Sequence, residues 1–158
     1  RLHRCRHDLD EVIVDWTYGA TWDEIDLDAR TWIIPAERMK AEAEHRVPLS
    51  EPAIALLRKL SAIRHGDFVF PGQRSDRPLS NMGMTMTLRR MTIKVTPHGF
   101  RSTFRTWVAE RTAYPHEVAE AALAHTQGDK VVAAYQRGDL FDKRRRLMDE
   151  WADFVVSA

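Results

Sequence analysis

The chain has 158 residues and is 44% hydrophobic, which suits one globular domain with a buried core and excludes a disordered chain. Its 24 lysines and arginines nearly balance 23 acidic residues, so a net charge of +1 neither requires nor excludes a nucleic-acid partner. The single cysteine, Cys5, cannot form an internal disulfide, which favours a reducing, cytoplasmic compartment. No apolar run approaches the ~20 residues of a membrane span and no signal-peptide pattern is present, so we expect no membrane partner.

The start of the chain is irregular. Because the first residue is Arg1 rather than methionine, we expect a piece of a longer protein. Residues 1–18 join a basic cluster, RLHRCRH, to an acidic and apolar run, DLDEVIVDW, and predict no regular element. His3, Cys5 and His7 could hold zinc or copper, as in a small metal-binding domain, but the segment lacks a convincing second ligand group. We therefore expect no metal and no cofactor.

A small antiparallel sheet is predicted from Trp22 onward. The segment TWDEIDLDARTWIIP has the pattern of two strands joined by a tight turn at Asp28–Ala29. The segment EHRVPLS alternates from His45 through Val47 and predicts a third strand. Lys40 lies in the polar loop before that strand, where a lysine is usually solvated.

Helices dominate the rest of the chain. Ser50 can cap a helix whose buried stripe would be Ala53, Leu56, Leu57, Leu60 and Ile63. DFVFPG predicts a short strand or extended segment, and Ser80 can cap a helix that ends near Arg90. Pro115 should begin a helix that runs to about Ala124, and a short helix should hold Val131 to Tyr135. The predicted fold class is mixed α+β and helix-dominant, with a small antiparallel three-stranded sheet on a helical body.

The last predicted helix should pack through one face, formed by Leu140, Leu147, Met148, Trp151 and Val155. Its charged run, Lys143–Arg146, should face outward, to solvent or to an anionic partner.

The segment TPHGFRSTFRTW carries the strongest local signals. Thr96 is a good N-cap and Pro97 suits the first helical position, so a helix should begin here. Its apolar stripe would be Phe100, Phe104, Trp107 and Val108. His98, Arg101 and Arg105 form a second stripe beside it.

Two interpretations of that second stripe stay open. The plain one is a solvated border, and the same His-x-x-Arg spacing recurs at His3 and Arg6. The functional one rests on position: free N–H groups in a first helical turn favour an anion, and an arginine can clamp a phosphate with two parallel hydrogen bonds.

His125 and Tyr135 are the remaining candidates. His125, in LAHTQG, has the plain interpretation of a C-terminal helix cap, and Tyr135, in AAYQRGD, that of a half-buried core residue. What departs from chance is the order of all the candidates: a lysine in a hairpin loop, His-x-x-Arg at a helix start, a histidine and then a tyrosine.

Taken together, these motifs resemble the catalytic domain of a tyrosine recombinase of the phage and genomic-island integrase type. The matching text is WDEIDLDARTWIIPAERMKAEAEHRVPLS, FVFPG, HGFRSTFRTW, LAHTQGDKVVAAYQRGD and RRRLMDEWADF. The resemblance covers residues 19–158, leaving 1–18 as an atypical segment. It implies that the N-terminal DNA-binding domains of the family would lie before residue 1.

The resemblance also implies a reaction: site-specific cleavage and rejoining of double-stranded DNA. Tyr135 would attack a phosphodiester and form a 3′-phosphotyrosyl link. Arg101, His98 and His125 would stabilise charge on the phosphoryl oxygens, and Lys40 would protonate the leaving 5′-oxygen. No metal or cofactor takes part. The resemblance further implies that copies of the chain self-associate on DNA, and the C-terminal helix could mediate this contact.

Two positions depart from the family pattern. An arginine, followed three residues later by an acidic residue, is expected before the sheet, but Ile13 and Trp16 occupy those positions. Arg4 and Arg6 lie nearby but are displaced. A catalytically impaired integrase remnant, or a DNA-binding module of the same fold, is therefore the alternative hypothesis.

Overall fold

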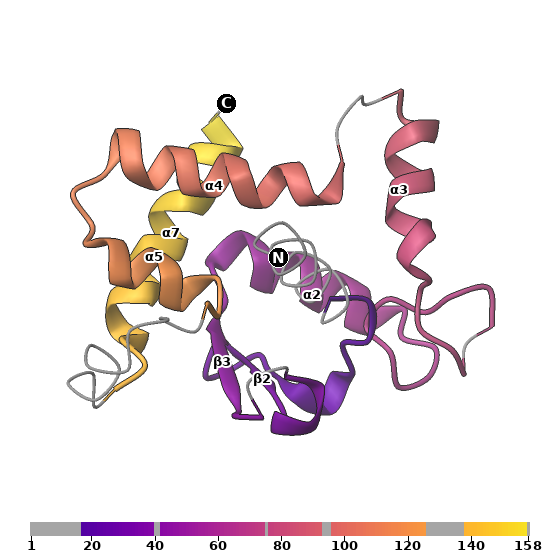
Figure 1. Ribbon diagram of the computed structural model, residues 1–158. Helices are drawn as coiled ribbons and strands as arrows, with labels where there is room; N and C mark the ends of the chain where they lie inside the picture. The colour runs from indigo at the N-terminus through magenta and orange to yellow at the C-terminus, as the bar shows by residue number, and fades with distance from the viewer. Residues whose placement is uncertain (1–16, 40–41, 75, 93–95, 126–137, 158) are drawn as a thin grey trace, which may run out of the picture.

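We describe a computed structural model of the chain (Figure 1). It describes residues 17–39, 42–74, 76–92, 96–125 and 138–157. Within these residues, five α-helices accompany one three-stranded antiparallel sheet. The expected fold class, mixed and helix-dominant, is confirmed.

The sheet forms where the alternation of side chains predicted it. Its strands are β1 (Ile25–Asp26), β2 (Thr31–Ile34) and β3 (His45–Pro48), in that order. In the turn between β1 and β2, the Asp26 carboxylate accepts hydrogen bonds from the backbone of Asp28, at 3.0 Å, and Ala29, at 2.7 Å. A side chain that accepts from the backbone two and three residues onward fixes a tight turn. Two 3₁₀-helices, η1 (Trp22–Glu24) and η2 (Ala36–Arg38), flank these strands.

The first hydrophobic core lies between the sheet and helix α2 (Glu51–Ala62). Its buried residues are Ala20, Trp22, Leu49, Ile54, Leu57 and Val69. The expected stripe on α2 was partly wrong, because Leu56 is 54% exposed and Ile63 is 66% exposed, whereas Ile54 is buried. The buried face centres on Ile54 and Leu57, and Leu56 is turned about 100° from Leu57. The segment DFVFPG is the extended segment rather than the strand of that expectation, and it forms two isolated bridges, Phe68 with Thr21 and Pro71 with Pro78.

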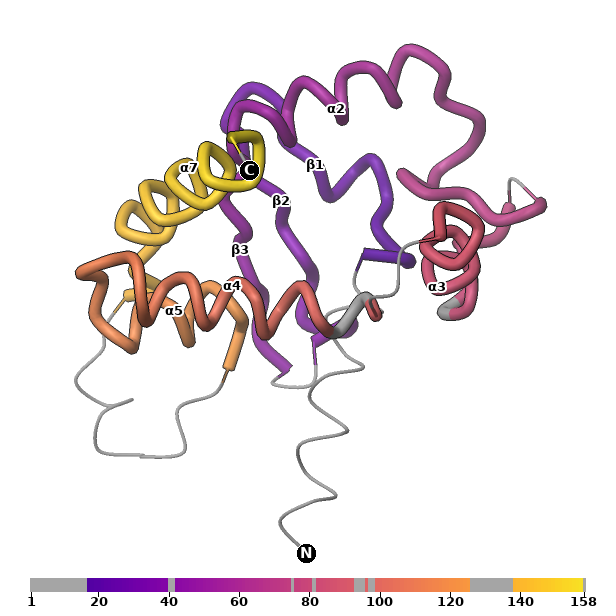
Figure 2. Tube along the Cα trace, turned by 90° about the horizontal axis from the view of Figure 1, so that it is seen from above, coloured from indigo at the N-terminus to yellow at the C-terminus, as the bar shows by residue number. Residues whose placement is uncertain are grey.

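Helix α3 (Asn81–Arg90) begins after Ser80, as expected, and stands apart from the other helices in both views (Figures 1 and 2). Met82 and Met86 are exposed on it, at 56% and 40%.

The second core joins helices α4 (Pro97–Arg111), α5 (His116–Ala122) and α7 (Phe141–Ser157). Its buried residues are Phe104, Trp107, Val108, Val118, Ala119 and Leu147. Thr96 caps α4 as expected, since its hydroxyl accepts from the backbone of Gly99 at 3.2 Å. Phe100, expected in the apolar stripe, is 54% exposed, whereas Phe104, one turn later on α4, is buried against Trp107 and Trp151. Helix α5 ends two residues before the expected Ala124.

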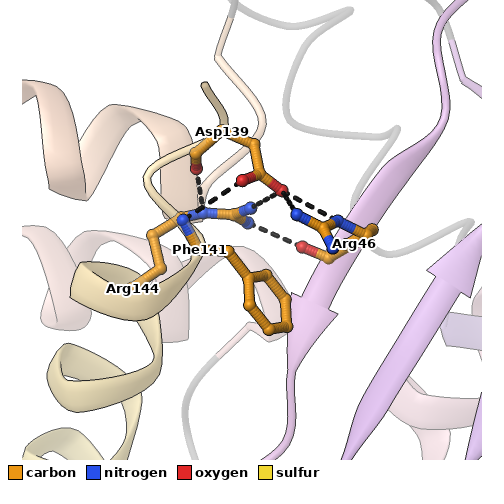
Figure 3. A network of polar contacts seen from close by, with 4 residues as sticks. All are labelled: Arg46, Asp139, Phe141 and Arg144. Carbon is orange, nitrogen blue, oxygen red and sulfur yellow. Dashed lines mark hydrogen bonds and ion pairs between the residues drawn. The ribbon is translucent and has the colours of Figure 1, made fainter. Parts of the chain in front are cut away.

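Helix α7 is joined to β3 by a buried arginine (Figure 3). Arg144 is 1% exposed; its guanidinium donates to the carbonyls of Asp139 and Arg46, each at 2.7 Å, and to the Asp139 carboxylate at 3.0 Å. Arg46 binds the same carboxylate at 2.8 Å, and its guanidinium lies over the Phe141 ring. We call this group the Arg144 joint.

Two expectations for α7 were therefore wrong. The run Lys143–Arg146 does not all face outward, because Arg144 is buried where Arg46 of β3 and Asp139 accept its hydrogen bonds. Val155 is 53% exposed, since the contact with α4 ends at the rings of Trp151 and Phe154. Leu147 is fully buried, and Leu140, Met148 and Trp151 pack against the same core, as predicted.

Replacing Trp151 should test the second core. Its ring meets Phe104 edge-on at 5.4 Å and Trp107 at 5.1 Å. We expect Trp151→Ala to lower the free energy of unfolding by about 3 kcal/mol, measured by urea denaturation. The control is Val155→Ala on the same helix, which should change it by less than ~0.5 kcal/mol. Equal effects of the two substitutions would contradict this packing.

Replacing Arg144 should test the joint. Arg144→Met leaves two carbonyl groups and part of a carboxylate without their donor, so we expect a loss of about 3–5 kcal/mol. Arg146→Met changes an exposed arginine two residues away and should cost under ~0.5 kcal/mol in the same experiment. If both variants unfold at the parent's urea concentration, Arg144 does not hold α7 to the sheet.

Candidate functional site

A hollow of about 180 Å³ lies where the η2–β3 connection, the end of α5 and the start of α7 meet. It is lined by Met39, Ala43, Glu44, His45, Ala121, Ala124, His125, Asp139 and Arg144. We call it the α5–α7 hollow. The Arg144 joint forms one wall, so the same contacts that hold α7 to β3 also fix the shape of this surface.

His45 is a half-buried titratable group of that wall, and its Nε2 is shielded from solvent. Burial and, to a smaller extent, the positive charge of Arg144 lower the pKa of its imidazole to about 4, while the Asp139 carboxylate acts in the opposite direction. His45 is therefore neutral at pH 7. Sequence analysis predicted only that His45 lies in the third strand.

The end of α5 determines where His125 lies. Ala124 has a positive φ of 52°, and the next N–H, that of His125, donates to the Glu120 carbonyl at 2.9 Å. The N–H of Ala124 donates to Ala121 at 3.2 Å, which completes a Schellman ending. A left-handed alanine costs about 1 kcal/mol. Ala124 packs against the buried pair Ile34 and Met39, a contact that helps to offset this cost.

The His125 side chain binds a carboxylate. Its Nδ1 lies 2.5 Å from Oε2 of Glu120, and its side chain is 25% exposed. Oε1 of Glu120 lies 3.0 Å from the Arg105 guanidinium and 3.7 Å from Nε2 of His116. The capping interpretation of His125 holds for its backbone N–H, whereas the imidazole is committed to Glu120.

Arg101 and Arg105 are not a solvated border, so that interpretation was wrong for both. Arg101 is half-buried and both terminal nitrogens of its guanidinium are shielded from solvent. Arg105, one helical turn further along α4, is paired with Glu120. Because Glu120 also holds His125, the chain of contacts places His125 and Arg105 at one side of the α4–α5 pair.

Several predicted site residues lie outside the described residues: Lys40, Tyr135 and the positions Ile13 and Trp16. His98 lies in the first turn of α4, but its side chain is also outside what is described. His3, Cys5 and His7 fall in the same category. Residues near Lys40 and Tyr135 in the sequence are described, however. Met39 directly precedes Lys40, and Asp139 follows Tyr135 by four positions.

Sequence analysis missed Glu120 and the residues of the Arg144 joint. Glu120 precedes His125 by five positions, a spacing with no special meaning on a regular helix. The left-handed residue between them is what brings the two side chains together.

Within the described residues, no group of three or more metal-ligating side chains gathers. None of the helices in that part of the chain has the length and hydropathy needed to cross a bilayer.

Comparison with known proteins places the chain among integrases. It is 39% identical to prophage integrase IntA of Escherichia coli K12 over 143 residues, which cover 88% of this chain and 34% of that protein. It is 36% identical to prophage integrase IntZ of the same strain, covering 86% and 34%, and 35% identical to the integrase of enterobacteria phage P4, covering 86% and 35%.

The chain thus spans about one third of the length of these relatives. A search of solved structures found no match. The model of the phage integrase family matches residues 17–139, which include all three strands, α2 to α5 and the Asp139 of the joint. The chain belongs to the phage integrase family.

Proposed function

We propose that this chain is the catalytic part of an integrase, which cleaves and rejoins double-stranded DNA at a specific site through a 3′-phosphotyrosyl intermediate. The observation that carries the proposal is the α5–α7 hollow. It is lined by Met39, next to Lys40, by His125, and by Asp139, four positions after Tyr135. One candidate catalytic residue, His125, lines this surface itself, while Lys40 directly follows one lining residue and Tyr135 precedes another by four positions.

Arg101 and His125 would act on the scissile phosphate. The transition state gathers negative charge on the phosphoryl oxygens, and fixed donors stabilise it most when water is excluded. The shielded guanidinium of Arg101 and the anchored imidazole of His125 are groups of that kind. His98, in the first turn of α4, would add a third donor.

Tyr135 would be the nucleophile and Lys40 the general acid. Ionising a free tyrosine at pH 7 costs about 4 kcal/mol, so nearby cations must stabilise the phenolate or a base must take its proton during attack. Lys40 would then protonate the 5′-oxygen as it leaves.

DNA and further copies of the chain are the proposed partners. The relatives are called integrases, and DNA is the substrate that the proposed reaction requires. Self-association on DNA through α7 stays a prediction. Outward-facing Val155 and Val156, 53% and 72% exposed, are the residues of α7 that favour it.

A catalytically impaired remnant is the second candidate. Its motivation is the sequence at Ile13 and Trp16, where the family pattern has an arginine and an acidic residue. Loss of one fixed donor costs about 10²–10³ in rate, which would leave DNA binding without efficient turnover.

A nicked duplex carrying the target site separates the two candidates. After cleavage next to the nick, a short fragment diffuses away and traps the covalent adduct. The enzyme hypothesis predicts an adduct that Tyr135→Phe abolishes. Tyr114→Phe is the matched control, because the Tyr114 hydroxyl is bound to Glu150 on α7, at 2.7 Å. It should leave adduct formation unchanged. An absent adduct in the parent, with DNA binding retained, would favour the remnant.

The half-buried imidazole of His45 predicts a pH dependence of stability. Its pKa is about 4 in the folded state and about 6.5 in the unfolded state. The unfolded chain therefore binds the proton first, and stability falls as pH is lowered from 6.5 towards 4, by up to ~3 kcal/mol. Urea unfolding of His45→Gln should show a weaker loss over this range. His65→Gln, at an exposed position, should follow the parent. A parent-like slope in His45→Gln would refute the assignment.

A further inference from the structure

We propose that Glu120 is a positioning residue that sets the orientation and tautomer of His125 at the α5–α7 hollow. The proposal deepens the function proposed above and rests on it for the catalytic role of His125. It is based on the contacts of the Glu120 carboxylate. These contacts reach Arg105 on α4, His116 on α5 and His125 in the turn that follows α5.

The contact between Glu120 and His125 assigns the two ring nitrogens. At 2.5 Å from Nδ1, Oε2 accepts the Nδ1–H of the imidazole. Nε2 is therefore the nitrogen left for a ligand. A neutral ring accepts a proton there, whereas a protonated ring donates one. Both roles that His125 could play, donor to a phosphate or acceptor of a proton, need Nε2 to face the substrate.

Glu120 is itself held in place. Its side chain is 16% exposed, and its other oxygen, Oε1, lies 3.0 Å from the Arg105 guanidinium. Arg105 also reaches Nε2 of His116 at 3.0 Å, so that one arginine bridges two groups of α5. A carboxylate with each oxygen committed to a different partner has little freedom to rotate. Glu120 therefore restrains the His125 ring while its other oxygen is paired with Arg105.

The backbone supports the same orientation. The N–H of His125 donates to the carbonyl of Glu120 at 2.9 Å, so main chain and side chain of the histidine bind the same residue. With two such attachments, the ring stays at the edge of the hollow that His125 lines. A residue that holds a histidine tautomer for catalysis acts in this way in hydrolase triads.

The first arm of the test measures the tautomer directly. The protonated nitrogen of the His125 ring is identified by nitrogen-15 correlation spectroscopy. We expect the proton on Nδ1 in the parent and a shift towards the Nε2–H form in Glu120→Ala and, to a smaller extent, in Glu120→Gln. Glu117→Gln is the matched control, since it neutralises a carboxylate one turn earlier on α5 that makes none of these contacts. It should leave the tautomer as in the parent.

The second arm measures adduct formation on the nicked duplex. Loss of His125 in His125→Ala should lower the rate by about 10²–10³, and misorientation in Glu120→Ala by about 10–10². A positioning residue acts only through its partner. Adding Glu120→Ala to His125→Ala should therefore change the rate by less than about 2-fold. Thermal unfolding of each variant identifies any that fail to fold, and Glu120→Gln keeps the volume of the side chain.

The outcomes separate this proposal from the function on which it rests. A parent that forms no adduct overturns the proposed function, and the tautomer of His125 then decides the positioning role alone. An unchanged tautomer in both Glu120 variants overturns the positioning role. So does an equal loss of rate with Glu120→Ala in the presence and absence of His125, or a His125→Ala variant as fast as the parent.

Discussion

The buried guanidinium of Arg144 is the constraint on which the arrangement of the site depends. An arginine that is 1% exposed is tolerated only when its donors are satisfied, and here they bind two carbonyls and a carboxylate. One of those carbonyls belongs to Arg46, so the requirement to satisfy a charge on α7 fixes that helix against β3. The segment carrying Tyr135 ends at the joint, at Asp139, while the loop carrying Lys40 leads into β3. The buried guanidinium of Arg144 thus connects Asp139, which follows Tyr135 in the chain, to Arg46, which follows Lys40.

A second fixed point comes from the end of α5. The left-handed Ala124 turns the chain sharply, and its contact with Ile34 and Met39 helps to offset the conformational cost. Because Met39 is also next to Lys40, the same small cluster connects the His125 turn to the lysine loop. Both fixed points contribute residues to the lining of the α5–α7 hollow. Neither uses a residue for which the proposed reaction has a chemical role, so scaffold and chemistry are carried by different side chains.

Local rules predicted much of the fold and less of the site. Alternation and turn chemistry at Asp26–Arg30 gave the hairpin, and the Thr96-Pro97 pair gave the start of α4. The stripe of α2 was misplaced because helical periodicity gives a face but not which neighbour covers it, as Leu56 shows. Arg144 could not be recognised, since it stands in a run of three arginines and its partner Arg46 is 98 positions away. Glu120 was missed because a left-handed residue, not helical spacing, brings it to His125.

The ion pair between Glu120 and Arg105 also distinguishes the two arginines of α4, Arg101 and Arg105. A carboxylate beside a proposed phosphate site would repel the substrate, and by Coulomb's law the repulsion is strong where water is excluded. Arg105 lies 3.0 Å from that carboxylate and cancels its charge at longer range. Arg105 is thus paired with Glu120, and the proposed reaction assigns the contact with the phosphate to Arg101, one turn earlier on α4. In the proposed site, the carboxylate that would orient His125 thus has a cation of its own, Arg105, and the two arginines of α4 would have different roles.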